Sequence, residues 1–425
     1  MVKGRLVVAG VSLQSTRGRL VLLSVGKAAV AMARAAEERL GAHLSEGLVV
    51  TPSRLLPEGG LNDSREPDVT PLISRLFLAG HPVPDERGVA AAREVEALAA
   101  SLGREDVLLV LLSGGASALL PAPSAGLRLE DKAVTTSLLL RSGATIQELN
   151  TVRKHLSRLK GGGLARLASP ARVFTLVLSD VVGDDLSTIA SGPTVPDPTT
   201  YLDALQVLQD RRVLNETPRA VRTHLEAGIR GQIPETPKGD DPVFRRTVSE
   251  VVGGNRQSVA AATREASRLG FRPVVLTTRL EGEAREVARC LVAILRESAS
   301  RPRPACFLAG GETTVSVTGR GQGGRNQEFA VAAAAGLEGF PVPAVVASLA
   351  TDGIDGASDA AGGVVDDQSA RRARALGLPA PGAFLAENDS RNFLGPLGDL
   401  ILTGPTGTNV VDVLVLLAAG APARL

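Results

Sequence analysis

The stretch Leu20-Val21-Leu22-Leu23-Ser24-Val25-Gly26-Lys27 decides the fold, because a continuous apolar run of strand length ends in a sharp turn. Ala-rich sequence with spaced Arg and Glu follows to Leu40, which predicts a helix after the strand. The same order recurs around four further apolar runs, at residues 48–51, 75–79, 107–112 and 173–178. Apolar strands that alternate with helices predict a parallel sheet covered on both faces, which is an α/β fold.

A change in composition divides the chain into two α/β sets. Pro, Gly and Asp crowd together from residue 215 to residue 246, which is typical of loops. After it we expect helices at 256–269, 281–297 and 326–337 and strands at 273–277, 306–309, 313–318, 344–349 and 410–417. Polar and apolar residues alternate in 313–318, as in an antiparallel or half-exposed strand. We expect a mixed sheet in the second domain. The predicted organisation is an N-terminal Rossmann-like parallel α/β/α domain at 1–232, a linker at 233–246 and a second α/β domain at 247–425.

Composition and charge exclude several classes of protein. The 425 residues indicate two or three domains, and the hydrophobic and charged fractions of 44% and 22% are close to the globular average. Lys and Arg number 47 against 45 Asp and Glu, and the chain has no Trp and one Tyr. It therefore lacks both the basic surface and the stacking aromatics of nucleic-acid binding, and we expect no nucleic-acid partner.

Cysteine, histidine and hydropathy are equally restrictive. The two cysteines, Cys290 and Cys306, cannot build a disulfide framework or a cysteine zinc site, and the four histidines show no zinc-hydrolase spacing. No apolar run approaches the roughly 18 residues of a membrane span, and the N-terminus shows no convincing signal peptide. We therefore expect a cytoplasmic enzyme with no membrane partner. The oligomeric state stays open, with a homodimer as one alternative.

Two strand-to-helix turns of the first domain have features of anion binding. Lys27 follows the glycine that ends the first strand, where the positive end of the next helix favours an anion. Another strand is followed by a turn of small residues whose backbone N–H groups can approach a phosphate or carboxylate closely. We assign Ser113, Gly114, Gly115 and Ser117 of this turn as candidate ligands. A surface lysine and a plain turn are the alternative interpretations.

A basic segment follows. Residues 150–160 predict a capped helix that ends at the three glycines 161–163, with Lys154 and Arg158 one turn apart on one face. We assign Arg153 and Lys154 to phosphate or substrate binding. A solvated basic helix face explains the pattern equally well.

Acidic side chains follow two of the predicted strands. Asp180 and Asp184 belong to a group of three carboxylates within six residues after strand 173–178, and Asp352 follows strand 344–349. Hard oxygen ligands of this kind suit Mg²⁺, which accepts one or two carboxylates together with substrate phosphates. Asp180 is the first candidate, and Asp352 is a candidate metal ligand or general base. Helix capping and plain Asp-Gly turns are the alternatives.

The second domain contains two glycine-rich stretches. Gly311 and Glu312 lie in a Gly-Gly-Glu-Thr-Thr segment after a strand, and the glycines of 319–324 precede Arg325 and Asn326 at a helix start. The second stretch formally satisfies the G-x-G-x-x-G dinucleotide fingerprint, which keeps an NAD-linked oxidoreductase open. A guanidinium at the helix start fits a bidentate phosphate clamp better than nicotinamide chemistry.

Six motifs, taken together and in this order, resemble the class II glycerate kinases, whose C-terminal half is called the MOFRL domain. The motifs are Val25-Gly26-Lys27-Ala28-Ala29, Ser113-Gly114-Gly115-Ala116-Ser117, Leu178-Ser179-Asp180-Val181-Val182-Gly183-Asp184, Gly310-Gly311-Glu312-Thr313-Thr314, Gly323-Gly324-Arg325-Asn326-Gln327-Glu328 and Ala350-Thr351-Asp352-Gly353-Ile354-Asp355-Gly356. The resemblance covers the chain from about Leu20 to Leu417.

The resemblance implies two α/β domains with the active site in the cleft between them, and phosphorylation of D-glycerate from ATP with a divalent cation, here Mg²⁺. The implied product is 2-phosphoglycerate. The catalytic lysine and arginine of the family fall on Lys27 and Arg325. We expect these two residues on the transferred phosphoryl group, Mg²⁺ on Asp180, Asp184 and Asp352, and a carboxylate, Asp180 first, as acceptor of the C2 hydroxyl proton.

Three alternatives stay open on the sequence. One is an NAD(P)H-dependent hydroxypyruvate reductase that uses the fingerprint at 319–324, although Glu338, at the required spacing, falls at a predicted helix end instead of a strand end. The second is a glycerate kinase that gives 3-phosphoglycerate. The third is a nucleotide-sensing protein without turnover.

Overall fold

The computed structural model describes residues 7–8, 10–13, 17–53, 73–299 and 303–420, and the chain forms two compact units. Unit 1 comprises residues 1–178 and 185–252, and unit 2 comprises residues 179–184 and 253–425. Among the described residues, no helix is long and apolar enough to cross a membrane.

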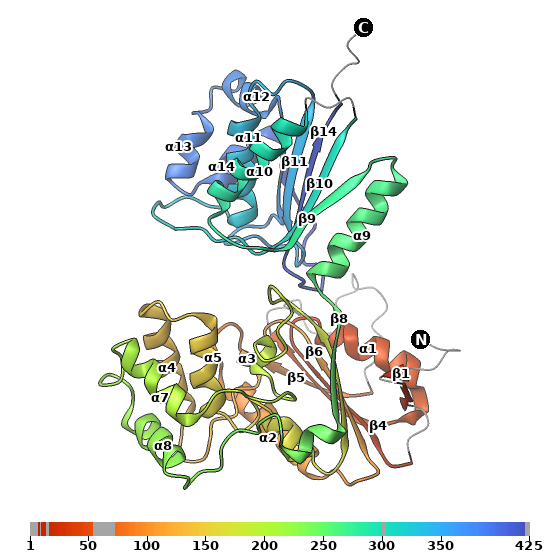
Figure 1. Ribbon diagram of the computed structural model, residues 1–425, viewed down its shortest axis with the longest axis vertical. Helices are drawn as coiled ribbons and strands as arrows, with labels where there is room; N and C mark the ends of the chain where they lie inside the picture. The colour runs from red at the N-terminus through yellow and green to blue at the C-terminus, as the bar shows by residue number, and fades with distance from the viewer. Residues whose placement is uncertain (1–6, 9, 14–16, 54–72, 300–302, 421–425) are drawn as a thin grey trace. The chain divides into compact units, whose positions relative to one another are not determined.

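Unit 1 is built on a parallel sheet, which for the described residues has six strands in the order β5-β4-β3-β6-β7-β8 (Figure 1). Strand β3 (Leu20–Val25) lies at its centre, and its pairings with β4 and β6 are parallel, as are those of β4 with β5 and of β6 with β7. The other strands of this sheet are β4 (Leu44–Pro52), β5 (Arg75–Ala79), β6 (Val107–Leu112), β7 (Arg172–Leu178) and β8 (Thr247–Gly253). A short hairpin, β1 (Val7–Val8) with β2 (Val11–Ser12), precedes it.

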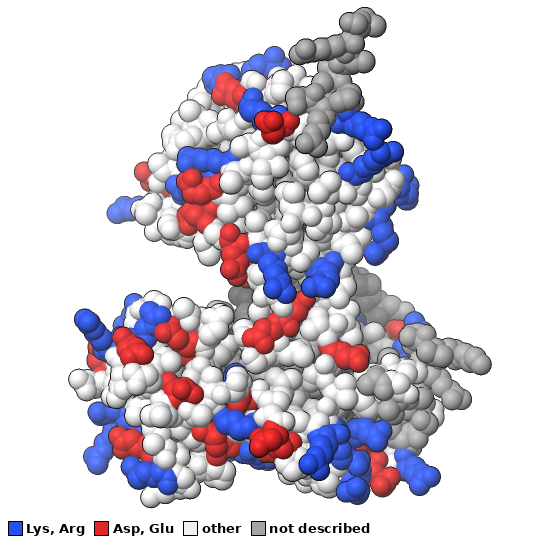
Figure 2. Space-filling model, in the orientation of Figure 1, with Lys and Arg blue, Asp and Glu red and all other residues white. Residues whose placement is uncertain are grey.

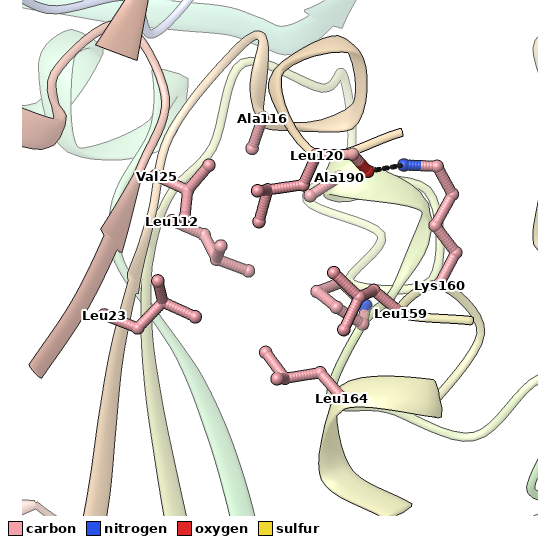
Figure 3. Close-up of a pocket in the computed structure, with 10 residues that line it drawn as sticks. Leu23, Val25, Leu112, Ala116, Leu120, Leu159, Lys160, Leu164 and Ala190 are labelled. Carbon is pink, nitrogen blue, oxygen red and sulfur yellow. Dashed lines mark hydrogen bonds between the residues drawn. The ribbon is translucent and has the colours of Figure 1, made fainter. Parts of the chain in front are cut away.

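Helices cover both faces of this sheet, as the continuous apolar strands predict. Helix α1 (Ala29–Leu40) packs on one face, against Leu20, Leu22 and Leu109. Strand residues such as Leu23 and Leu112 face the opposite side, where they meet Leu164 of a second helical layer (Figure 3). That layer includes α2 (Glu86–Ala100), α3 (Ala116–Leu119) and α6 (Gly163–Ala168).

A separate group of helices extends unit 1 beyond its sheet (Figure 1). It consists of α4 (Leu129–Arg141), α5 (Ile146–His155), α7 (Tyr201–Asp210) and α8 (Arg219–Ile229). Leu139, Val152, Leu208 and Leu225 form its own apolar core. Short 3-10 turns also lie in unit 1 at Gly41–His43, Ile189–Ser191 and Pro242–Arg246.

Unit 2 is built on a mixed sheet, which for the described residues has six strands in the order β13-β12-β11-β14-β10-β9. Strand β14 runs antiparallel between β10 and β11, whereas β9 and β10 are parallel. The strands are β9 (Pro273–Leu280), β10 (Ala305–Gly311), β11 (Ala344–Ala350), β12 (Gly362–Asp366), β13 (Leu400–Ile401) and β14 (Asp412–Ala418). The carboxyl ends of β9, β10 and β11 and the amino end of β14 therefore lie at one edge.

The alternating burial of the strands places a core on each face of the second sheet. Leu414 and Leu416 face the larger core, under α10 (Ala284–Ser298) and α11 (Arg325–Leu337). Cys306 and Leu308 face Val259 of α9 (Asn255–Arg268) on the other side (Figure 1). Helices α12 (Ser369–Ala375), α13 (Pro381–Ala386) and α14 (Ser390–Leu397) lie with α10 and α11.

The two-domain α/β fold with one parallel and one mixed sheet is confirmed, but two predicted elements are wrong. Residues 313–318 form no strand, because their backbone turns to the start of α10 and bonds with Gly282 and Glu283. The helix predicted at 150–160 is α5, which begins at Ile146 after a Thr145 capping box and ends at His155. It ends there because Leu156 and Arg158 hydrogen-bond to the chain at 122–124.

The units divide at a different place from the predicted linker. Strand β8 hydrogen-bonds to β7 and so completes the first sheet, although it follows the Pro- and Gly-rich segment. That segment is anchored within unit 1, where Glu235 accepts hydrogen bonds from His155 and from the backbone of Tyr201. Segment 233–246 is therefore part of unit 1.

Candidate functional site

Lys27 lies at the carboxyl edge of the first sheet, between β3 and α1. Its backbone N–H donates to the carbonyl of Gly114 at 2.8 Å, and the N–H of Ala28 donates to Ser113 Oγ at 3.0 Å. Gly26 has φ +131, and a Cβ there would clash with Ser113 Oγ, so only glycine fits. The turns after β3 and β6 thus form one hydrogen-bonded unit that fixes the backbone of Lys27.

The turn after β6 uses its predicted ligands in different ways. Ser113 is buried and accepts from Ala28, so its hydroxyl shapes the turn. Gly115 has φ +88, and a Cβ there would lie 2.8 Å from the His81 ring and 3.6 Å from Lys27 Cγ. Ser117, two residues further on, accepts a hydrogen bond from Arg153 at 2.6 Å. The structure therefore brings Lys27, the glycine turn and the Ser117–Arg153 pair to one edge of unit 1.

Lys154 points elsewhere. Its Nζ lies 3.3 Å from Oδ1 of Asp197, and both side chains are buried. Asp197 also accepts from the N–H and hydroxyl of Thr199 and from the hydroxyl of Thr236. Lys154 thus belongs to an interior ion pair that fastens segment 197–236 to α5.

The corresponding edge of unit 2 gathers the ends of three strands. Asp412, the first residue of β14, is in register with Gly311 at the end of β10 and with Ala350 at the end of β11. Glu312 follows Gly311 directly, and Asp352 follows Ala350 by two residues. Because β14 runs antiparallel between two parallel strands, its first residue stands among their last ones.

Arg325 begins α11 and is held by two of these carboxylates. Its Nε and one terminal nitrogen donate to the two oxygens of Asp412 at 2.6 and 3.0 Å, and its other terminal nitrogen lies 2.9 Å from Glu312 Oε1. Burial alone would lower the pKa of Arg325, but Asp412 and Glu312 raise it above its ordinary value. The guanidinium is therefore charged, fixed in orientation and still 31% exposed.

The start of α11 is fastened by a buried carboxylate. Asp355 accepts from the backbone N–H groups of Asn326 and Gln327 at 3.1 and 2.9 Å. Asn326 is also buried, with its amide between Asp355 and Ser348. Asn326 therefore positions the residue before it in sequence, Arg325, and its own side chain is enclosed by protein groups.

The predicted metal ligands all belong to unit 2. Asp180 and Asp184 lie in its short segment 179–184, where a Cβ on Gly254 would approach Asp184 Oδ1 to 2.9 Å. Asp352 Oδ1 accepts from the N–H of Ile354 at 3.2 Å. Burial raises the pKa of Asp412, and the charge of Asp352 adds to this rise while Arg325 opposes it.

Within the described ranges, no three or more His, Cys, Asp or Glu side chains gather closely enough to hold a metal ion by themselves. One or two carboxylates remain compatible with Mg²⁺, which keeps several waters and takes its other ligands from substrate phosphates.

The space beside each glycine of the formal dinucleotide fingerprint is occupied by other atoms of the protein. A Cβ on Gly319 would clash with Glu387, one on Gly321 with Asp389, and one on Gly324 with Asp355. A dinucleotide-binding turn follows a strand, but the segment that precedes these glycines is not a strand. These glycines are small because the chain packs against itself here.

The sequence interpretation did not identify Asp412 or Asp355 as functional. A signal was present for Asp412, because a lone carboxylate interrupts an otherwise apolar run at 410–417. Asp355 stands in the same motif as Asp352, but nothing in the sequence distinguishes a cap of a distant helix from a ligand.

Comparisons with known proteins match both parts of the chain to family models. Residues 3–226 match the family described as Domain of unknown function (DUF4147), and residues 305–412 match the MOFRL family. Glycerate 2-kinase from Pyrococcus horikoshii is 39% identical over 415 residues, covering 96% of this chain and 89% of that protein. D-glycerate 2-kinase from Thermotoga maritima is 44% identical over 402 residues, with coverages of 93% and 90%.

The chain also matches a solved structure over most of its length. The crystal structure of glycerate kinase from Thermotoga maritima matches with a TM-score of 0.84 at 43% identity, covering 94% of this chain and 92% of that one. A putative hydroxypyruvate reductase from Agrobacterium vitis is 40% identical over 408 residues, with coverages of 94% and 87%.

Proposed function

The chain belongs to the glycerate kinase family with a MOFRL domain, and from this premise we propose that it transfers the γ-phosphoryl group of ATP to the C2 hydroxyl of D-glycerate. In this step the C2 oxygen forms a bond to the γ-phosphorus, the bond to the bridging oxygen breaks, and ADP leaves. The products are 2-phosphoglycerate and ADP. Both substrates are small molecules.

The observation that carries the proposal is the fixed guanidinium of Arg325 at a glycine-rich helix start. The bidentate Asp412 pair holds it before any substrate arrives, so no reorganisation is needed when charge develops on the phosphoryl oxygens. We propose that Lys27 acts on the same phosphoryl group, with a charge placed by the turn after β3. The C2 hydroxyl proton goes to a carboxylate, for which we propose Asp180.

A divalent cation fits the charge balance at Arg325. Glu312 and Asp412 both pair with the Arg325 guanidinium, and the charge of Asp352 acts on Asp412, so the local charge is negative and would repel a polyphosphate that arrives alone. We propose that Asp352 and Asp180 hold Mg²⁺ together with the ATP phosphates, with Asp184 as a further candidate. The ion would neutralise phosphate charge there.

The reductase alternative draws support from the name of the Agrobacterium vitis relative, but the enclosed glycines at 319–324 argue against a dinucleotide turn. One coupled assay separates the alternatives. The purified protein receives ATP, Mg²⁺ and D-glycerate, and the product is passed to enolase with and without phosphoglycerate mutase. A parallel sample receives NADH and hydroxypyruvate.

The proposal predicts glycerate-dependent ADP release with an enolase signal that needs no mutase. A signal that needs the mutase means the 3-phosphate product. NADH oxidation without ADP release would replace the kinase by a reductase, and ATP binding without turnover would indicate a sensor.

A further inference from the structure

Within the described part of unit 1, three cations lie close together without a carboxylate partner. Arg153 donates to Ser117 Oγ, Lys160 donates to the carbonyl oxygens of Ser117 and Leu120 at 2.8 and 3.1 Å, and Lys132 donates to the carbonyl of Pro121. Figure 3 shows the Lys160 ammonium directed away from the apolar side chains and toward the carbonyl of Leu120. Among the described residues, none of the three forms an ion pair. The group has a net positive charge that this part of the protein does not neutralise.

This charge is placed where it is costly. Burial lowers the pKa of Lys132 and of Lys160 well below the ordinary lysine value, and neighbouring cations, Arg153 among them, lower both further. Arg153 cannot lose its proton near neutral pH, so its charge persists. Cations packed this way are unfavourable unless an anion joins them. An anion next to Arg153 would supply the missing charge.

A chain of polar groups leads away from Arg153. Ser117 Oγ lies 3.0 Å from Ser191 Oγ, which donates to Asn150 Oδ1 at 2.8 Å. Asn150 is 4% exposed, and its Nδ2 has no hydrogen-bond partner in the part of the chain that is described. A buried donor without an acceptor costs about 1–3 kcal/mol. At one end of this chain of polar groups the Asn150 amide lacks an acceptor, and at the other end most N–H donors of the Arg153 guanidinium have no acceptor among the described residues.

The backbone that holds Ser191 is strained. Ala190 and Ser191 have φ of +53 and +59, a left-handed conformation that non-glycine residues rarely adopt. The strain places the Ser191 hydroxyl between Ser117 and Asn150. Strain of this kind persists where the surrounding structure fixes it, and it is concentrated at ligand-binding sites.

The cluster also lies near the proposed reacting lysine. Ser117 follows Gly115 by two residues, and a Cβ on Gly115 would lie 3.6 Å from Lys27 Cγ. Arg153 is partly exposed to solvent, whereas Asn150 and Lys160 are buried. An anion that enters from solvent would therefore meet Arg153 before the two buried residues, close to Lys27.

We propose that Arg153, with Ser117 and Asn150, binds the carboxylate group of glycerate. This inference rests on the proposed function. A planar guanidinium matches the two oxygens of a carboxylate, and in glycerate the carboxylate carbon is bonded to the carbon that bears the reacting hydroxyl. Holding the carboxylate beside the turn of Lys27 would place the C2 hydroxyl near that lysine. The cluster makes glycerate, and not an uncharged polyol, the substrate.

The test measures substrate affinity and selectivity in Arg153→Gln, with Arg141→Gln as the matched control, because Arg141 is exposed at the end of α4. The KM for D-glycerate should rise about 10- to 100-fold in Arg153→Gln while the KM for ATP stays within about twofold. The preference for D-glycerate over glycerol, which lacks the carboxylate, should fall by a similar factor. Arg141→Gln should behave as the unaltered protein.

Calorimetric titration with D-glycerate in the absence of ATP gives a readout independent of turnover, and binding should be lost in Arg153→Gln. If this variant does not fold, as judged by circular dichroism, Arg153→Lys replaces it and should weaken glycerate binding about tenfold, because an ammonium cannot pair bidentately.

A rise in the KM for ATP alone would assign the cluster to nucleotide phosphate and overturn the proposal. Unchanged constants for both substrates, with active unaltered protein, would make the cations structural. Absence of any glycerate-dependent turnover in the unaltered protein would contradict the proposed function instead. In that case the calorimetric titration of unaltered protein and Arg153→Gln still decides whether the cluster binds the carboxylate.

Discussion

Two side chains carry the proposed chemistry, one in each unit. Replacing Lys27 or Arg325 by Ala removes a positive charge from the transferred phosphoryl group, and we expect a fall in kcat of roughly 10³-fold for Arg325→Ala. Both variants should keep the circular dichroism spectrum of the unaltered protein, because both side chains are partly exposed. Near-normal turnover in either variant would contradict the catalytic role proposed for that residue.

Asp412 acts on the reaction only through Arg325. Asp412→Asn keeps the shape of the side chain but removes the charge that fixes the guanidinium, so kcat should fall roughly 10- to 100-fold while both KM values change little. Asp359→Asn is the matched control, because this substitution removes the same charge from unit 2. Asp359 pairs with Arg391 at the surface. Equal effects of the two substitutions on kcat would show that orientation of Arg325 does not matter.

Helix α5 is the element that presents Arg153, and its first turn is stabilised by Glu148. The hydrogen bond from Arg211 lowers the pKa of Glu148 to about 2, aided by the Thr145 cap. Because this folded-state pKa lies below the ordinary 4.5, the stabilisation is complete above about pH 4.5 and is lost as pH falls toward 2.

Glu148→Gln should therefore lower the free energy of unfolding by about 1 kcal/mol at pH 7 and flatten its dependence on pH between about 4.5 and 2. Urea unfolding across that pH range measures both effects. Glu216→Gln, at an exposed site without an ion pair among the described residues, should leave the profile unchanged. A parallel profile in Glu148→Gln would contradict the assignment.

Elements with a strong apolar pattern were predictable, and those defined by contacts far along the chain were not. The strands at 20–25, 75–79 and 107–112 have the bounds that their apolar runs predict. The segment 313–318 alternates as a strand does, yet its hydrogen bonds go to the turn before α10, which periodicity does not encode. Local pattern therefore predicts elements, whereas tertiary partners decide where some of them end.

The same limit applies to the candidate site. The glycine turns, Lys27 and Arg325 stand out because their residue types are unusual at strand ends. Asp412 comes from 87 residues beyond Arg325, and Ser191 meets Asn150 over 41 residues. No spacing rule connects such residues, since the sheet order and the strained turn bring them together. Lys154, one residue from Arg153, points into the interior for a reason that sequence also hides, its pairing with Asp197.

At the scale of the whole molecule, the two units have separate cores, which predicts two unfolding transitions. The chain has no Trp and one Tyr, and Tyr201 is buried in unit 1, so tyrosine fluorescence follows unit 1 whereas circular dichroism follows both. Saturating D-glycerate, at about 100 times its Kd, should raise the fluorescence transition by about 5–10 °C through the Arg153 cluster.

The dichroism transition that fluorescence does not report should keep its temperature when glycerate is added. Fluorescence and dichroism curves that coincide in the absence of ligand would show that the units unfold as one. Arg153→Gln serves as the negative control for the ligand shift.

Charges of both signs intermingle over much of the surface of unit 1 seen in Figure 2, which fits the near balance of 47 basic and 45 acidic residues. Small anionic substrates then gain their attraction from local clusters and not from the field of the whole protein. Recognition by unit 1 should accordingly weaken only modestly with salt, and the KM for D-glycerate between 50 and 300 mM KCl measures this. A steep increase of this KM with salt concentration would indicate long-range electrostatic steering of glycerate.

The six residues 179–184 belong to unit 2, although the chain on either side of them belongs to unit 1. In evolutionary terms, residues 253–425 alone do not make up the whole of unit 2, so exchanging them alone does not exchange the complete unit. A single genetic crossover near residue 253 would join a new C-terminal half to the recipient's own 179–184 segment, whose Asp184 must then fit closely beside the donor's equivalent of Gly254. Homologous chimaeras should therefore need this six-residue segment exchanged together with the C-terminal half, and the two pieces are expected to descend as one lineage.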